Sequence, residues 1–143
     1  MRKQYHFRPS EEGLQAWDMD RVATLARDLP AFEVRLDSIR ELDEPYWFGG
    51  GAQDATCRAV LEHARLIAEA DLSFPIVLSS NGRVMDGMHR VAKAVLAGMS
   101  TIVAVRFEQD PAPNFVGVRP EDLPYEGNDR ASSIGAIGPA PEG

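Results

Sequence analysis

Hydrophobic positions along the chain change between a helical and a strand-like spacing. Three segments carry apolar residues three or four positions apart, which is typical of amphipathic helices. These segments are 19–29, 57–72 and 88–97. Asp18 can cap the first helix, either Asp54 or Thr56 can cap the second, and Gly98 stands where the third should end. The pattern therefore predicts three helices.

Three other segments have the patterns of strands. Residues 32–36 alternate apolar and charged side chains, which is typical of a strand with one buried face. Residues 74–78 and 102–107 are almost continuously apolar, as in buried strands. The Asn81-Gly82 pair favours a type I′ hairpin turn that leads from 74–78 into a partner strand over 83–85, because both residues tolerate a positive φ.

The chain divides into four predicted parts. Residues 1–31 form an N-terminal helical extension, and 32–110 form the main domain. Prolines interspersed with apolar residues favour an ordered but irregular wrap over 111–125. Residues 126–143 are rich in Gly, Ser, Ala and Pro and lack aromatic side chains, so we expect a flexible tail there.

The composition limits the classes of function. The 143 residues, of which 44% are hydrophobic, suffice for one domain with a core. A net charge of −7 disfavours direct DNA binding and adsorption to anionic membranes. The single Cys57 excludes an intramolecular disulfide, and no apolar stretch has the length of a signal peptide or a membrane span. We therefore expect a cytoplasmic protein without membrane contact.

The most informative segment is Asp86-Gly87-Met88-His89-Arg90, at the expected start of the third helix. Free backbone N–H groups, an imidazole and a guanidinium meet there, which suits an anion. Gly87 would let the backbone approach a ligand, and Arg90 offers a planar fork to two phosphate oxygens. The alternative is a turn glycine after an N-cap, Asp86, followed by two solvated side chains.

This segment, followed by Ala92 and Ala94, resembles the D-G-x-H-R signature of the ParB N-terminal/sulfiredoxin-like superfamily, also known as the ParB-like nuclease domain family. The resemblance covers roughly 32–107. It implies a compact α+β fold, with a small mixed sheet, flanking helices and a helix N-terminus that binds phosphate. It also implies a nucleotide ligand, such as ATP with Mg²⁺, bound by residues 86–90. Partition proteins, sulfiredoxins and free-serine kinases are members of this superfamily.

The chain departs from two of these branches. Met88 stands where sulfiredoxins need a cysteine nucleophile, and a thioether cannot perform that chemistry. The roughly 36 residues after Phe107 are rich in Pro and Gly and do not indicate the helix-turn-helix of a partition protein. A nuclease is disfavoured because a basic surface and a two-metal carboxylate cluster are not evident. The kinase-like interpretation stays open.

The loop after the first predicted strand contains the candidate catalytic acids Glu41, Asp43 and Glu44. In related kinases an acid of this loop deprotonates the acceptor hydroxyl, while Mg²⁺ and Arg90 would screen the phosphate charge. The alternative is an ordinary solvated loop.

Trp47 and His63 are candidate substrate-pocket residues. Trp47 can either stack on a ligand or close its loop as a small core plug. His63 borders the apolar face of the second helix, where it is either a partly buried structural histidine or a polar group of the nucleotide pocket. His63, His89 and Cys57 do not have the spacing of a zinc site, so the expected metal is Mg²⁺ carried by the nucleotide.

Two functions follow as hypotheses. The first is a nucleotide-binding protein that transfers a phosphoryl group from ATP to a small molecule. The second is a non-catalytic regulatory or chromosome-partition-associated module that contacts another protein or forms a homodimer. The motif at the helix start makes the first the leading hypothesis. The second is the alternative, and it is supported by the absence of an evident catalytic triad, the acidic composition and the proline-rich segment.

Overall fold

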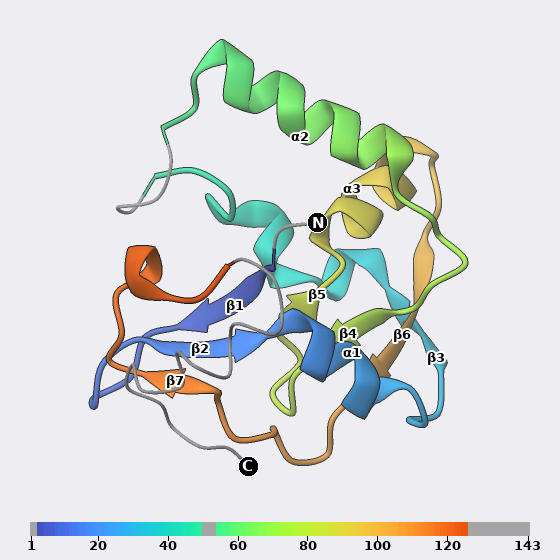
Figure 1. Cartoon of the computed structure of the whole chain (residues 1–143). Coiled ribbons are helices and arrows are strands. Elements are labelled where there is room, and N and C mark those ends of the chain that lie inside the picture. The colour runs from blue at the N-terminus through green and yellow to red at the C-terminus, as the bar shows by residue number, and fades with distance from the viewer. Residues whose placement is uncertain (1–2, 50–53, 126–143) are drawn as a thin grey trace. The chain divides into compact units, whose positions relative to one another are not determined.

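Residues 3–49 and 54–125 are described by the computed structural model of the chain (Figure 1). The chain forms two compact units. We call Leu29–Gln109 the central unit, and Met1–Asp28 together with Asp110–Gly143 the terminal unit. The described residues contain three α-helices and two sheets, in agreement with the predicted α+β class.

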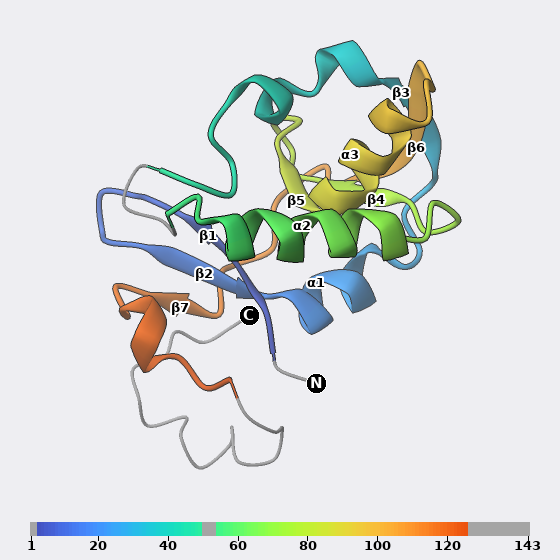
Figure 2. The same ribbon diagram turned by 90° about the horizontal axis from the view of Figure 1, so that it is seen from above.

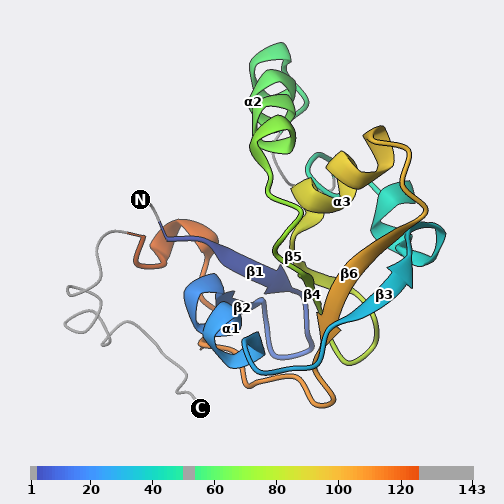
Figure 3. The same cartoon turned by 90° about the vertical axis from the view of Figure 1, so that its right-hand side faces the viewer.

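The central unit is built on a four-stranded mixed sheet with the order β3-β6-β4-β5 (Figure 3). Its strands are β3 (Phe32–Arg35), β4 (Ile76–Leu78), β5 (Val84–Asp86) and β6 (Thr101–Arg106). β6 runs antiparallel to β3 and parallel to β4, and β5 forms an antiparallel hairpin with β4. This unit covers almost the same residues as the domain predicted over 32–110.

Two helices complete the central unit. α2 (Cys57–Glu69) begins after Thr56, whose hydroxyl accepts a hydrogen bond from the Ala59 amide, so Thr56 and not Asp54 is the cap. α3 (Met88–Leu96) contacts β4 and β6, and α2 packs on α3 (Figure 2). The core between α3 and the sheet consists mainly of aliphatic side chains. They include Ile76, Leu78, Val84, Val91, Ala94, Ile102 and Ala104.

The hairpin between β4 and β5 forms as predicted, but its turn is not of type I′. That turn needs a positive φ at two successive residues, and only Gly82 has one here, with φ of +85°. The Asn81 side-chain oxygen accepts hydrogen bonds from the Ser79 hydroxyl and the Arg83 amide. These local bonds favour a turn over 79–82, closed by the Gly82 amide on the Ser79 carbonyl at 2.9 Å, with glycine in the left-handed position.

The terminal unit contains a three-stranded antiparallel sheet with the order β1-β2-β7. Its strands are β1 (Tyr5–Arg8), β2 (Gln15–Asp18) and β7 (Phe115–Val116). Helix α1 (Met19–Ala26) follows β2 directly and begins at the predicted cap Asp18. The extension predicted as helical over 1–31 therefore also contains two strands. These strands were not predicted because each is short and β2 pairs with residues about a hundred positions away.

Residues 111–125 are ordered by polar contacts with the first strands of the same unit. The buried Trp17 donates its indole N–H to the Pro111 carbonyl at 2.8 Å, and the Tyr5 hydroxyl donates to the Pro124 carbonyl at 2.6 Å. The segment also contains β7 and a 3₁₀ turn at Pro120–Asp122. The tail predicted over 126–143 lies outside the described residues.

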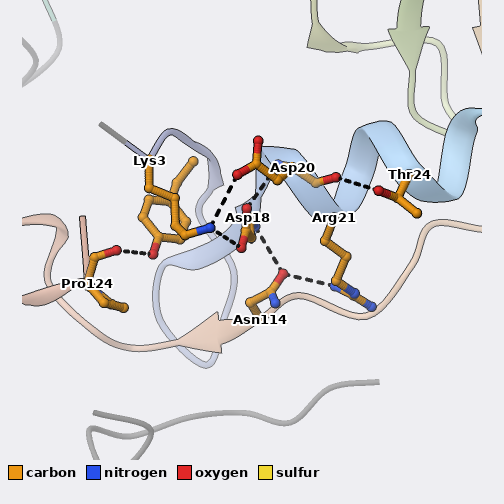
Figure 4. Close-up of polar contacts among 8 residues, drawn as sticks. Lys3, Asp18, Asp20, Arg21, Thr24, Asn114 and Pro124 are labelled. Atoms are coloured by element: carbon orange, nitrogen blue, oxygen red, sulfur yellow. Dashed lines mark hydrogen bonds and ion pairs between the residues drawn. The ribbon is translucent and has the colours of Figure 1, made fainter. Parts of the chain in front are cut away.

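Side chains of the terminal unit also close the start of α1 (Figure 4). The Asp18 carboxylate accepts from the Asp20 amide at 2.9 Å and pairs with the Lys3 ammonium at 3.0 Å. Asn114 accepts from the Asp18 amide and from the Arg21 guanidinium at 3.0 and 2.9 Å.

In the described ranges, none of the helices combines the length and the apolar character that crossing a membrane would require.

Candidate functional site

The motif over 86–90 spans the junction between β5 and α3. Gly87 occupies the N-cap position with a φ of +109°. A Cβ atom on this residue would lie 2.7 Å from the Ile76 Cγ2 atom, which is closer than packing allows. The fold therefore requires glycine here, both for the left-handed backbone and for the close approach to β4. The approach of a ligand to Gly87 stays a prediction.

The start of α3 differs from the starts of α1 and α2 because no side chain caps it. Asp86, the alternative N-cap, instead pairs with Arg90 at 3.2 Å. Within the described residues, the amides of Met88, His89 and Arg90 have no acceptor. These amides and the helix dipole give the start of α3 a partial positive charge, which is suited to an anion.

Arg90 is engaged with the protein. Its Nη1 donates to the Phe74 carbonyl at 3.1 Å and to the Pro75 carbonyl at 2.6 Å, and its Nη2 pairs with Asp86. The side chain is only 18% exposed. The guanidinium therefore ties α3 to the residues before β4, and the fork expected to face two phosphate oxygens is directed at backbone carbonyls. A ligand could meet only the N–H groups that these contacts leave.

His89, in the motif over 86–90, contacts His63 of α2. The His63 Nδ1 and His89 Nε2 atoms are 2.8 Å apart. The ring planes differ by 22° and the ring centres are 5.1 Å apart, which is close to the N–N distance plus the two ring radii. The two imidazoles thus lie side by side in nearly one plane and meet edge to edge through a hydrogen bond.

Trp47 lies flat against this pair of histidines. Its ring centre is 4.5 Å from that of His63 and 4.6 Å from that of His89, with interplanar angles of 19° and 13°. Phe48 closes the side of His63 with an edge contact at 5.3 Å. Trp47 is also packed against the core of the central unit. The structure therefore brings together Trp47, His63 and His89, and one face of the indole is covered by imidazoles.

Burial lowers the pKa values of both histidines. For His89 the neighbouring His63 lowers the pKa further and Asp86 opposes the shift, while for His63 the opposing charge is Glu62. The hydrogen bond between the rings also disfavours the doubly protonated pair, because one of the two facing nitrogens must lack a proton. The pair is consequently neutral or carries a single added proton.

The three candidate catalytic acids lie in different environments. Glu41, in the 3₁₀ turn Arg40–Asp43, is 4% exposed, and its Oε2 accepts from the Val84 amide at 2.8 Å. Its Oε1 is buried and has no partner among the described residues. Glu44 pairs with Arg83 at 2.8 Å, which lowers the pKa of Glu44. Asp43 is exposed. The solvated-loop alternative is therefore wrong for Glu41 and describes Asp43.

Tyr46 lies in the same loop as Glu41 and has a shifted pKa. Burial, and then the charges of Glu41 and Asp86, raise the pKa of the Tyr46 phenol to about 12. The loop that begins at Arg40 thus carries Glu41 and Tyr46, and it places Trp47 against the histidine pair.

Comparison of the chain with protein-family models, with curated proteins and with solved structures found no match. The resemblance to the ParB N-terminal/sulfiredoxin-like superfamily accordingly stays a prediction from the motif.

Arg83, Tyr46 and the contact between the histidines were not predicted from the sequence. Tyr46 is the first of three consecutive aromatic residues, 46–48, that precede the glycines 49–51, which is a weak local signal. Arg83 approaches both Glu41 and Glu44 across about forty residues, and no local pattern encodes that pairing. His63 and His89 were each candidates, but their contact depends on the packing of α2 on α3.

Proposed function

We propose that the central unit binds a nucleotide, with ATP and Mg²⁺ as the reference ligand, and places its phosphates at the start of α3. The observation that carries this proposal is that α3, unlike α1 and α2, begins without a side-chain cap, while the three amides of its first turn lack acceptors within the described residues. Such amides bind phosphate groups in many proteins. The nucleotide class comes from the resemblance of the D-G-x-H-R motif.

The net charge of −7 does not oppose this proposal, because phosphate binding at a helix start depends on local dipoles. Asp86 is the carboxylate closest in sequence to the free amides, and its ion pair with Arg90 offsets its charge. His89 stands in the first turn of α3 and can accept a proton.

Mg²⁺ would be carried by the phosphates of the nucleotide. In the described parts of the chain, no three His, Cys, Asp or Glu side chains are grouped so that they could hold a metal ion. Mg²⁺ commonly keeps several waters and binds through substrate phosphates. We therefore assign no step to a metal held by the protein.

Phosphoryl transfer to a small hydroxyl compound is the catalytic form of the proposal, with Glu41 as the base. One carboxylate oxygen of Glu41 is fixed by the Val84 amide, and the other has no partner in the described structure. A carboxylate that is oriented and still has a free oxygen can accept the proton of an acceptor hydroxyl. Glu44 is less suited because Arg83 makes hydrogen bonds to both of its carboxylate oxygens, whereas Arg83 approaches only the Oε2 of Glu41, at 3.5 Å.

A non-catalytic regulatory module is the second candidate function. Its supporting observation is that the Glu41 carboxylate accepts a hydrogen bond from the Val84 amide of β5, which gives Glu41 a structural role in the fold. In that case the nucleotide, or its absence, would control contact with a protein partner or a second copy of the chain. ATP consumption with and without Glu41 distinguishes the two forms.

Calorimetry with ATP, ADP, CTP, GTP and tripolyphosphate, each with Mg²⁺, tests the proposal. We expect binding, and a stabilisation of about 2.7 kcal/mol when the ligand is at a hundred times its Kd. His89→Asp should abolish binding and preserve the fold, because a carboxylate suits the first turn of a helix but repels phosphate. His89→Gln is the neutral control. If none of these ligands binds at millimolar concentration, the proposal is wrong.

Glu41→Gln tests the catalytic form, because it retains an oxygen for the Val84 amide and removes the base. We expect nucleotide binding to persist and phosphoryl transfer to a supplied hydroxyl acceptor to be lost. Transfer that continues at the same rate in this variant would exclude Glu41 as the base. Binding without transfer in the unmodified chain, across a panel of small hydroxyl acceptors, would favour the regulatory module.

A further inference from the structure

The two nitrogen atoms of His89 face different surroundings. Its Nε2 meets the Nδ1 of His63 at 2.8 Å. Its Nδ1 is the ring nitrogen nearer to its own backbone, in the first turn of α3, and has no hydrogen-bond partner among the described residues. Because Nε2 is engaged by His63, Nδ1 is the nitrogen of His89 that is left for a ligand bound at the start of α3.

His63 can favour one protonation state of His89. When His63 is neutral with its proton on Nε2, its Nδ1 is an acceptor for a proton on His89 Nε2. A His89 imidazolium then has a donor for His63 on one side and a donor for a phosphate oxygen on the other. A charge-assisted hydrogen bond of this kind is stronger than a neutral one.

We propose that His63 is a positioning residue for phosphate binding: it accepts the Nε2 proton of His89, so that the pair takes up one proton when phosphate binds and His89 presents Nδ1–H to the ligand. This inference rests on the proposed function and adds a proton to the binding reaction. The balance is simple. One proton moves from solvent to the histidine pair, and no covalent bond of the ligand changes.

The surroundings of the pair make the uptake dependent on a ligand. Uncharged rings cover it, since Trp47 lies on its face and Phe48 at its edge. The ionisable groups that act on it are Glu62 of α2, which favours a charged His63, and Asp86, which favours a charged His89.

Three further ionisable groups interact with these carboxylates. Arg65 pairs with Glu62, Arg90 pairs with Asp86, and the charge of Asp86 contributes to the raised pKa of the Tyr46 phenol. Burial outweighs the carboxylates and lowers both histidine pKa values, so the free pair is largely neutral at pH 7.

A bound phosphate would reverse that balance, because a dianion at the start of α3 stabilises a cation in the same turn. Only one proton fits, since two imidazolium rings would place two N–H groups against each other across the 2.8 Å contact. The number of protons taken up should therefore approach one and not exceed it.

Calorimetry in two buffers of different ionisation enthalpy tests this inference, with tripolyphosphate and with ATP and Mg²⁺ at pH 7.5. The unmodified chain should take up between about half a proton and one proton on binding. His63→Leu removes the acceptor and should reduce the uptake to near zero and weaken binding. His63→Gln keeps an acceptor oxygen and should restore a large part of the uptake, which a merely structural role of His63 would not predict.

The outcomes separate the two proposals. Binding without proton uptake in the unmodified chain, or with equal uptake in His63→Leu, would overturn the role of His63 and leave the phosphate site in place. If neither ligand binds, the phosphate site is wrong, and the role of His63 is wrong with it.

Discussion

The start of α1 in the terminal unit and the start of α3 in the central unit solve the same physical problem in different ways. Each exposes backbone N–H groups that have no partner within the helix. At α1 the Asp18 carboxylate accepts from the Asp20 amide, and Lys3 compensates its charge (Figure 4). At α3 a glycine stands at the N-cap, and the nearby Asp86 is directed to Arg90.

This difference shows how one chain can contain both a completed helix start and an available one. The sequence D-M-D at α1 supplies its own acceptor, so an anion would have to displace Asp18. In the sequence D-G-M at α3 the aspartate stands one residue before the N-cap, which is Gly87, and it pairs with Arg90. The glycine at the N-cap thus leaves the start of α3 without a capping side chain.

The largest effect is expected from Gly87→Ala, which changes the geometry of the open helix start. The new Cβ would meet Ile76 at 2.7 Å, and a φ of +109° is unfavourable for alanine. We expect the free energy of unfolding to fall by about 3 kcal/mol, from overpacking and backbone strain together.

Gly82→Ala is the matched control for that variant. Gly82 has a φ of +85° but no atom within 4 Å of its Cβ position, so only the backbone cost of about 1 kcal/mol applies. Urea denaturation followed by circular dichroism measures both variants. Equal losses in the two would show that Ile76 yields and that the close approach at α3 is unimportant.

A smaller effect is expected for the pH dependence of the stability of the terminal unit, in which His6 is a single histidine without a histidine partner. Burial, and then Arg8, lower the pKa of His6 in the terminal unit from 6.5 to about 4, while Asp110 opposes the shift. Because the unfolded chain binds the proton of His6 more tightly than the folded chain does, the free energy of unfolding has its full value above pH 6.5 and decreases as the pH falls toward 4. We expect a loss on the order of 2 kcal/mol.

Trp17 reports on that loss because its ring lies 5.7 Å from His6. In a Trp47→Phe background, fluorescence-detected urea unfolding should shift to lower urea between pH 6.5 and 4.5, and His6→Gln should flatten the dependence. An equal pH dependence in His6→Gln would assign the effect to other groups.

The smallest effect is expected from Asp18→Ala, which would make α1 start as openly as α3. The loss of the cap should destabilise the terminal unit by about 1 kcal/mol. Asp18→Asn retains a capping oxygen and removes the charge facing Lys3, so it should recover most of that loss. If Asp18→Asn is as unstable as Asp18→Ala, the ion pair and not the cap stabilises this helix start.

Local patterns predicted the elements that depend on neighbours in sequence. The helical periods and the cap Asp18 are examples, as is the hairpin between β4 and β5. The pairing of β2 with β7 was not predictable, because two short strands about a hundred residues apart carry little local signal.

The candidate site shows the same division. The motif located the start of α3, but the direction of Arg90 depends on the carbonyls of Phe74 and Pro75. The burial of Glu41 depends on the register of β5, which places the Val84 amide against its carboxylate. Such contacts are properties of the tertiary structure, and a single sequence does not display them.

The contact of Trp47 with the two imidazoles has an optical consequence. An indole that lies flat against an imidazole loses emission when that ring becomes cationic, because the imidazolium is the better electron acceptor. The central unit therefore contains an intrinsic fluorescent reporter at the start of α3. In a Trp17→Phe background, its intensity would follow the protonation of the histidine pair without any added dye.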